Sequence, residues 1–213
     1  MAETAIDIPA PAGTLQASLH QSTTNDNSGF LMCHPHPLFD GTMHNKVVTT
    51  ATRTAAGLGL STLRFNFRGV GDSSGQHDQG RGETDDVLAA IRYARQTLGW
   101  QTLYLGGFSF GAGMACLAAC QQPDWVQGLF LVAPAVHHFD APNQLPFEFD
   151  SHVYMGDADE VVPFDEVDDW VARLVPQPHW HVFSDGGHFF HGRLTDLKQS
   201  LQQDLQTLLA GTS

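Results

Sequence analysis

Short apolar runs alternate along the chain with longer segments in which apolar residues recur every three or four positions. The short runs predict buried strands, and the longer segments predict amphipathic helices. Such alternation is typical of a mostly parallel, twisted sheet with helices on both faces. The predicted strands span residues 15–21, 29–34, 61–67, 102–108, 128–133, 152–156 and 179–184. The predicted helices span residues 45–57, 82–98, 110–121, 165–174 and 194–209.

No repeat, low-complexity tract or linker divides the chain, so we expect residues 1–213 to form a single domain. A chain of this length can bury a substantial core.

No apolar run approaches the roughly 20 residues of a membrane span, and the first residues lack the basic and apolar segments of a signal peptide. Three cysteines fit a reducing compartment. We therefore expect a cytoplasmic monomer or homodimer.

The charge balance excludes two classes of partner. The chain has 10 basic and 23 acidic residues, and its formal net charge is −13. Nucleic acids and anionic membranes both bind to basic surfaces. We therefore expect neither of them as a partner, and we expect a small-molecule substrate instead.

The most informative motif is Gly107-Phe108-Ser109-Phe110-Gly111, which has the pattern G-x-S-x-G. A predicted strand leads into it and a predicted helix of small residues leads out. This strand–turn–helix setting holds a serine in a strained conformation with its hydroxyl projecting from the sheet. The motif therefore predicts that Ser109 is a nucleophile.

A nucleophilic serine needs a base and an acid that orients the base. Downstream of Ser109, two further loops follow predicted strands, one with Asp157 and Asp159 and the other with His188. The carboxyl ends of parallel strands lie along one edge of a sheet, so residues from these loops can meet there. His188 follows two glycines and is the expected base. His191 is the alternative, but it lies where the last helix begins, which favours capping or substrate contact.

The oxyanion of an acyl-transfer reaction needs two backbone N–H donors. Phe110, the residue after the nucleophile, should supply one of them. The loop after residue 34 should supply the other, where Pro35 and Pro37 have no N–H. His36 and Leu38 remain, and comparison with the more usual His-Gly-x loops favours His36.

Other charged and imidazole groups have simpler interpretations. Arg68 and Asp86 are expected to form a structural ion pair between a loop and a helix N-terminus. Among the 12 histidines, the pairs His34/His36 and His179/His181 have a spacing that puts both rings on one face of a strand. Zinc can use such pairs, but the sequence offers no convincing further ligands. We therefore expect no metal and no other cofactor.

Several stretches together resemble a group of small, lidless bacterial α/β-hydrolases, over about residues 29–197. The group is loosely related to dienelactone hydrolases, which use a cysteine nucleophile where this chain has Ser109, and to small carboxylesterases. The motifs that carry the resemblance are His34-Pro35-His36-Pro37-Leu38, Met43-His44-Asn45-Lys46-Val47-Val48, Leu63-Arg64-Phe65-Asn66-Phe67-Arg68-Gly69-Val70-Gly71, Gly107-Phe108-Ser109-Phe110-Gly111, Gly156-Asp157-Ala158-Asp159-Glu160-Val161-Val162-Pro163 and His188-Phe189-Phe190-His191-Gly192-Arg193-Leu194.

The resemblance implies an α/β-hydrolase fold and favours Asp159 as the orienting acid. Asp157 is the alternative acid, and its other expected role is that of a buried, turn-forming residue.

Residues 134–150 are too few for a multi-helix lid, so we expect an ordered loop there and a shallow, open site. The expected function is hydrolysis of small carboxylic esters through an acyl-enzyme. Thioester or amide hydrolysis, and a non-catalytic binding role on the same scaffold, are the alternatives.

Overall fold

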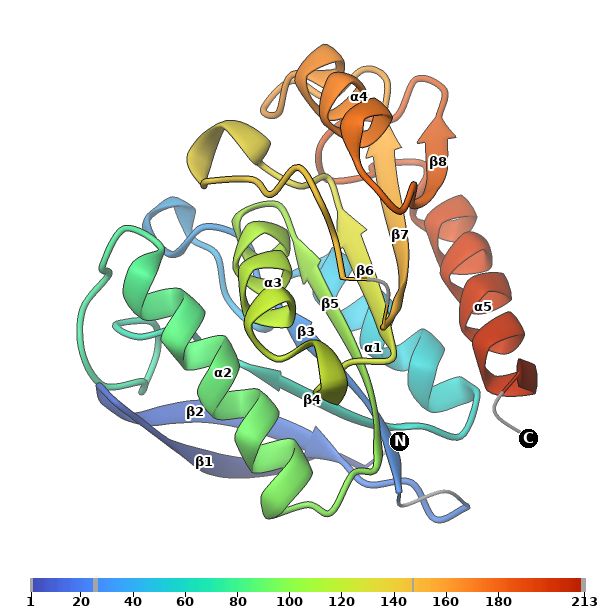
Figure 1. Cartoon of the computed structure of the whole chain (residues 1–213). Helices are drawn as coiled ribbons and strands as arrows, with labels where there is room; N and C mark the ends of the chain where they lie inside the picture. Colours follow the sequence, from blue (N-terminus) through green and yellow to red (C-terminus); the bar gives the residue numbers. More distant parts are fainter. Residues whose placement is uncertain (1, 25–26, 147, 212–213) are drawn as a thin grey trace.

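A computed structural model describes residues 2–24, 27–146 and 148–211. Its centre is one eight-stranded sheet in the order β1-β2-β4-β3-β5-β6-β7-β8 (Figure 1). Strands β1 and β2 form an antiparallel pair, β2 also runs antiparallel to β4, and all later neighbours are parallel. The strands are β1 (Thr4–Ala10), β2 (Gly13–His20), β3 (Ser28–Cys33), β4 (Ser61–Phe65), β5 (Thr102–Phe108), β6 (Gly128–Val132), β7 (Asp150–Gly156) and β8 (His179–Phe183).

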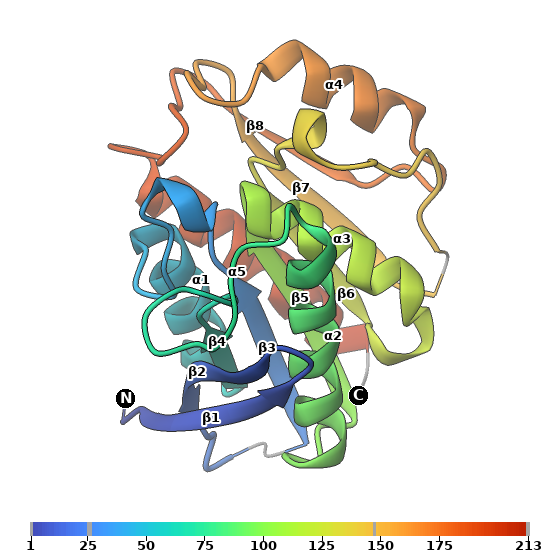
Figure 2. The same ribbon diagram turned by 90° about the vertical axis from the view of Figure 1, so that its left-hand side faces the viewer.

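Helices cover both faces of the sheet, as the sequence predicted. Helices α2, α3 and α4 lie on one face, and α1 and α5 lie on the other (Figure 2). The central strands β3, β4, β5 and β6 are buried on both sides. Strands β3, β5 and β6 are accordingly mostly apolar, whereas β4 also buries Ser61, Thr62 and Arg64. The helices are α1 (Lys46–Gly57), α2 (Arg81–Gln96), α3 (Phe110–Gln121), α4 (Phe164–Arg173) and α5 (Leu194–Gly211).

The predicted elements match the observed ones closely, with one omission. Strand β5 and helix α3 have the predicted bounds, and α1 begins one residue later because Asn45 caps it by accepting a hydrogen bond from Val47 N–H. Strand β1 was not predicted. It is an edge strand in which Ile8 alone is buried, so its sequence lacks a strong apolar pattern.

The loop between β4 and α2 is tied down by a buried ion pair. The guanidinium of Arg68 donates to both carboxylate oxygens of Asp86 at 2.7–3.1 Å, and Arg68 N–H donates to the same group at 3.0 Å. The Asp86 side chain is fully buried. The prediction of a structural Arg68–Asp86 pair is therefore confirmed.

The connection between β6 and β7 contains no lid in the part that the structure describes. Its regular structure is a single 3₁₀ turn, Val136–His138, within the residues that the structure describes there. Phe147 lies outside the described residues. None of the helices in the described ranges has both the length and the apolar character of a bilayer span.

Candidate active site

Ser109 stands at the junction of β5 and α3, at the carboxyl edge of the sheet. Its backbone has φ 56° and ψ −118°, a conformation that is strained for a residue with a side chain. Its N–H donates to Val132 O at 2.8 Å, which anchors the turn to the neighbouring strand. The predicted sharp turn is thus present and presents the Ser109 side chain above the sheet.

The two glycines of the motif allow this turn to form. A Cβ atom at Gly107 would overlap the backbone of Gly111, and one at Gly111 would overlap the carbonyl of His34. Both contacts are with main chain, which cannot rotate away as a side chain can. The strand, the turn and the loop after β3 are therefore packed backbone to backbone.

Gly111→Ala is expected to destabilise the protein by at least about 1–3 kcal/mol, because the added methyl group overpacks a backbone contact. Chemical denaturation would measure this change in the free energy of unfolding. Gly57→Ala is the matched control, since a Cβ atom there meets nothing within 4 Å. Equal stability of the two variants would contradict the close packing at Gly111.

A chain of hydrogen bonds joins the serine to the two loops predicted to meet it. His188 Nε2 lies 3.1 Å from Ser109 Oγ, and His188 Nδ1 lies 2.8 Å from Asp159 Oδ2. The side chains of His188 and Asp159 are 3% and 0% exposed. The structure thus brings together Ser109, His188 and Asp159 from loops that follow β5, β8 and β7.

Both loops are held by several further hydrogen bonds. The second oxygen of Asp159, Oδ1, accepts from the N–H groups of Val161 and Val162 at 2.8 and 2.7 Å. The next residue, Glu160, accepts from His188 N–H at 3.1 Å. The ring of His188 packs against Phe108 and Phe189. Adjacent acids in one loop therefore hold the ring and the main chain of His188.

The alternative acid and base lie elsewhere. Asp157 accepts from Asp185 N–H at 2.7 Å and so stabilises the turn between these loops. Its turn-forming role is as predicted, but its predicted burial is wrong: the residue is exposed, because the turn lies at the outer rim of the sheet. His191 is also exposed, and its ring stacks on Phe189.

The N–H of Leu38, one of the two candidate oxyanion donors, is already engaged. It donates to His36 Nδ1 at 3.1 Å within the 3₁₀ turn Pro37–Phe39. For the N–H groups of His36 and Phe110, no hydrogen bond is found within the described residues. His36 also packs its ring on Phe110, with centroids 4.7 Å apart.

Comparison with known proteins shows where this architecture belongs. The α/β-hydrolase fold model matches residues 50–152. A serine hydrolase homologue from Coxiella burnetii is 39% identical, with a TM-score of 0.88 over 96% of this chain and 98% of that one. A serine hydrolase without a lid from Xanthomonas campestris is 36% identical, with a TM-score of 0.86 over 97% and 95%. The chain belongs to the lidless α/β serine hydrolases. An uncharacterized Rickettsia prowazekii protein is 32% identical over 93% of this hydrolase and 87% of its own length.

The hydrolase has a cavity of about 490 Å³ at Ser109. Its wall includes His36, Phe39, Phe110, Val162 and Phe189. Apolar side chains also surround its mouth, where Phe39 is 78% exposed and Phe189 40%. Aromatic side chains of the surrounding loops therefore build walls beside Ser109, although no lid covers it within the described residues.

The loop after β3 is held by His34, a buried histidine that was not predicted as a catalytic residue. His34 Nδ1 donates to Pro35 O at 2.6 Å, and His34 Nε2 accepts from Phe67 N–H at 3.0 Å. Burial lowers the pKa of His34 to about 4, which keeps the ring neutral. The prediction that His34 and His36 share a strand face is wrong, since β3 ends at Cys33.

The histidine pair His179/His181 has neighbours that the sequence did not reveal. Asp204 and His152 lie next to His181, within reach of a shared ion. His179 is not part of this group, since its ring stacks on that of His152. Helix α5 carries Asp204 to the β7–β8 edge, a contact that no local pattern indicates.

Proposed function

We propose that this hydrolase cleaves small carboxylic esters with Ser109 as nucleophile, His188 as general base and Asp159 as orienting acid. The observation that carries the proposal is the hydrogen-bonded chain from Ser109 Oγ through His188 to Asp159, at 3.1 and 2.8 Å. In these roles, Nδ1–H of His188 donates to Asp159, and Nε2 accepts from the serine hydroxyl. The neutral tautomer that a base requires is thereby fixed.

The reaction would proceed in two acyl transfers. Ser109 Oγ attacks the ester carbonyl carbon while His188 Nε2 takes the hydroxyl proton. The tetrahedral intermediate collapses, the carbon–alkoxide bond breaks, and His188 returns the proton to the departing alcohol. Water then attacks the acyl-enzyme with His188 again as base, and the carboxylic acid leaves as Ser109 recovers its proton.

The developing oxyanion would be held by the N–H groups of Phe110 and His36. Phe110 follows the nucleophile at the start of α3, where backbone N–H groups have no partner within the helix. The engagement of Leu38 N–H with the His36 ring favours His36 over Leu38 as the second donor. Such preorganised donors typically contribute a factor of about 10²–10³ to kcat.

Labelling with a fluorophosphonate tests the proposed nucleophile. The probe should modify Ser109 in the wild-type protein, and peptide mass spectrometry would locate the adduct. Labelling of the wild-type protein at another residue would contradict the assignment. Absence of any adduct in the folded protein would favour a non-catalytic binding role.

The acyl group should be small, because apolar side chains line the cavity but no lid extends its walls within the described residues. Each methylene buried against its walls contributes about 0.8 kcal/mol. We expect kcat/KM for p-nitrophenyl esters to rise with acyl length until the chain has made all its contacts with the cavity wall. The value should therefore be highest at acyl chains of about two to six carbons. A continued rise to ten or more carbons would instead favour a lipase or an acyl-thioesterase.

Substrates with one acyl group and different leaving groups separate the remaining alternatives. The same three residues can act on esters, thioesters or amides. A matched panel of acetyl oxygen ester, thioester and anilide would show which bond the enzyme prefers, and we expect the oxygen ester.

We also propose a cytoplasmic location. The free thiols of Cys33, Cys116 and Cys120 support it.

A further inference from the structure

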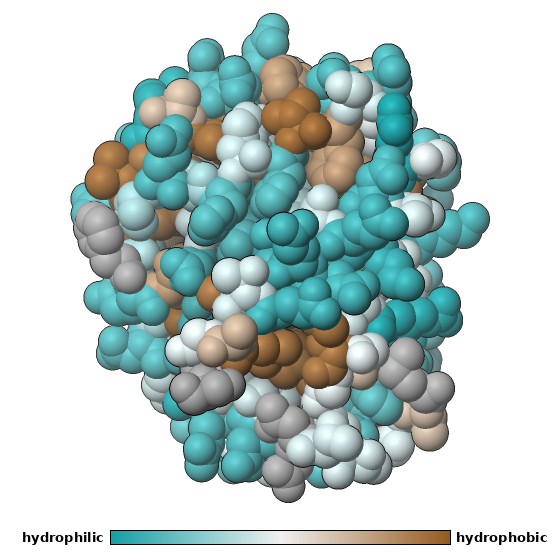
Figure 3. Space-filling model, turned by 90° about the vertical axis from the view of Figure 1, so that its right-hand side faces the viewer, coloured by the Kyte–Doolittle hydropathy of each residue, from teal (hydrophilic) through white to brown (hydrophobic). Residues whose placement is uncertain are grey.

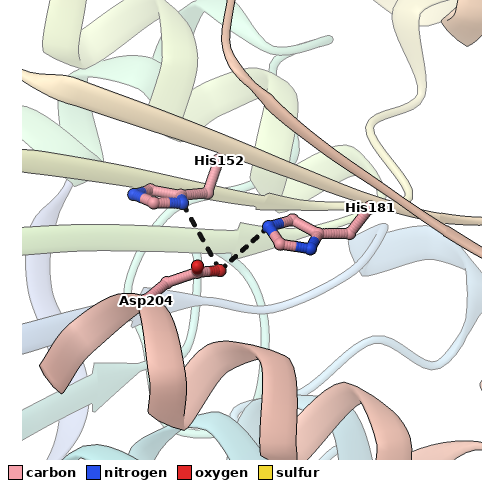
Figure 4. Close-up of side chains that lie close together, drawn as sticks. All are labelled: His152, His181 and Asp204. Carbon is pink, nitrogen blue, oxygen red and sulfur yellow. Dashed lines mark ion pairs between the residues drawn. The ribbon is translucent and has the colours of Figure 1, made fainter. Parts of the chain in front are cut away.

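A second group of chemically active side chains lies on the α5 side of the sheet. His152 comes from β7, His181 from β8 and Asp204 from α5, and their ligand atoms all lie within 4.8 Å of one another. Asp204 Oδ2 is 3.4 Å from His152 Nδ1 and 3.0 Å from His181 Nε2 (Figure 4). None of these residues lines the cavity at Ser109. The cluster is thus separate from the proposed catalytic chemistry.

The ring of His152 is stacked between two other aromatic rings. It lies between the rings of Phe130 and His179, with centroid separations of 4.9 and 4.6 Å and nearly parallel planes. The residue is 3% exposed. Within the described part of the chain, neither of its ring nitrogens has a hydrogen-bond partner. A buried polar atom without a partner costs free energy unless something else binds it.

The nitrogens also have the orientation expected of metal ligands. Figure 4 shows the His152 and His181 rings with a nitrogen each turned toward the gap between them, and the Asp204 carboxylate beside that gap. His181 Nε2 is close to Asp204 but makes no hydrogen bond of acceptable angle with it or with any other described group. Ligands that share an ion point at a common centre and not at each other.

The separations fit a small transition-metal ion. Two ligands about 2.1 Å from a tetrahedral Zn²⁺ are roughly 3.4 Å apart. The two oxygen–nitrogen distances, 3.4 and 3.0 Å, are close to this value. The nitrogen–nitrogen distance, at most 4.8 Å, would shorten with a small rotation of the His181 ring on its edge strand.

Asp204 is prepared to act as an anionic ligand. The hydroxyl of Tyr154 donates to its Oδ2 at 2.5 Å, which orients the carboxylate as outer partners of metal ligands commonly do. The carboxylate is thus held in a fixed position beside the two imidazoles.

We propose that His152 Nδ1, His181 Nε2 and Asp204 Oδ2 form a binding site for Zn²⁺ that fastens α5 to the β7–β8 edge. Two imidazoles and one carboxylate are a ligand set that suits zinc, with water as the fourth ligand. The site is reachable from solvent, since the side chains of His181 and Asp204 are partly exposed. The face of the molecule that lies on the right in Figure 1 is mostly hydrophilic around an apolar patch (Figure 3).

Metal titration of the full chain tests the proposal. The metal-free protein should bind a single equivalent of Zn²⁺ by isothermal titration calorimetry, and its melting temperature should rise with added Zn²⁺ because the ion binds the folded state. Co²⁺ bound in the same site should show the intense visible d–d absorption of a tetrahedral complex. Absence of a saturable equivalent, or only weak absorption typical of hydrated Co²⁺, would overturn the proposal.

Variants assign the ligands. Asp204→Asn and His181→Gln should abolish the Co²⁺ spectrum and the Zn²⁺-dependent rise in melting temperature. Tyr154→Phe, which removes only the outer hydrogen bond, should lower the affinity by about 10–100-fold. His44→Gln removes an exposed histidine elsewhere and should bind Zn²⁺ like the wild type.

Binding at the active-site imidazole is the main competing explanation. His188→Gln should retain the zinc equivalent if His152, His181 and Asp204 bind the ion. Loss of binding in His188→Gln, together with unchanged binding in Asp204→Asn, would place the ion at Ser109 and refute the site. If Asp204→Asn fails to fold, His181→Gln and Tyr154→Phe still distinguish the two sites.

Discussion

Ser109→Ala is expected to lower the rate of hydrolysis of short p-nitrophenyl esters by about 10³-fold or more while leaving the protein folded. The side chain is short and its loss removes only the hydroxyl that His188 Nε2 faces at 3.1 Å. The turn itself depends on backbone bonds and on Gly107 and Gly111, which the change leaves intact. Steady-state kinetics would measure the rate, and circular dichroism would check the fold.

The same experiment extends to the base. His188→Ala should be nearly as harmful as Ser109→Ala, and the double variant should be hardly worse than either single one, because residues that act as a unit have non-additive effects. Wild-type activity in Ser109→Ala would point to another nucleophile. Multiplicative losses in the double variant would show that the two residues act independently.

The second large effect is expected for Asp159→Asn. An asparagine amide can donate toward His188 Nδ1 and so favours the wrong imidazole tautomer, and the comparable change in serine proteases lowers kcat by about 10⁴-fold. The asparagine carbonyl oxygen would keep accepting from the N–H groups of Val161 and Val162, as Asp159 Oδ1 does, and this leaves the NH₂ group facing His188. Kinetics with the ester substrate would measure the loss in kcat.

Asp157→Asn is the matched control, two residues away in the same loop. Asp157 is exposed and holds Asp185 N–H, so its change should affect stability more than turnover. If Asp157→Asn abolished turnover in a well-folded protein while Asp159→Asn did not, the assignment of the acid would be wrong.

The parts of the fold that the sequence predicted well are those governed by local pattern. Strand β5, the Ser109 turn and α3 combine a buried apolar run, two glycines and a small-residue helix, which all favour one conformation. The meeting of Ser109, Asp159 and His188 followed from chain order and from the shared edge of parallel strands. Their catalytic roles stay predictions until kinetics test them.

The features that the sequence did not predict depend on contacts between distant segments. Strand β1 pairs with β2 at the edge of the sheet and needs only one buried side chain, Ile8, so its sequence lacks a strong alternation. The contact of Asp204 with His152 and His181 depends on how α5 packs against the sheet. Glu160 resembles any solvent-exposed acid until the His188 loop is placed beside it.

The two hydrogen bonds that Asp159 and Glu160 accept from His188 have a consequence for engineering. Asp159 holds the ring of His188, and the adjacent Glu160 holds its main chain. An insertion in either loop would therefore misalign both contacts together. The segments of residues 37–41 and 136–140 contribute to the cavity wall without taking part in this double contact. Substrate range is therefore best redesigned by grafting or randomising those two segments while the loops of residues 157–162 and 184–188 are left at their native lengths.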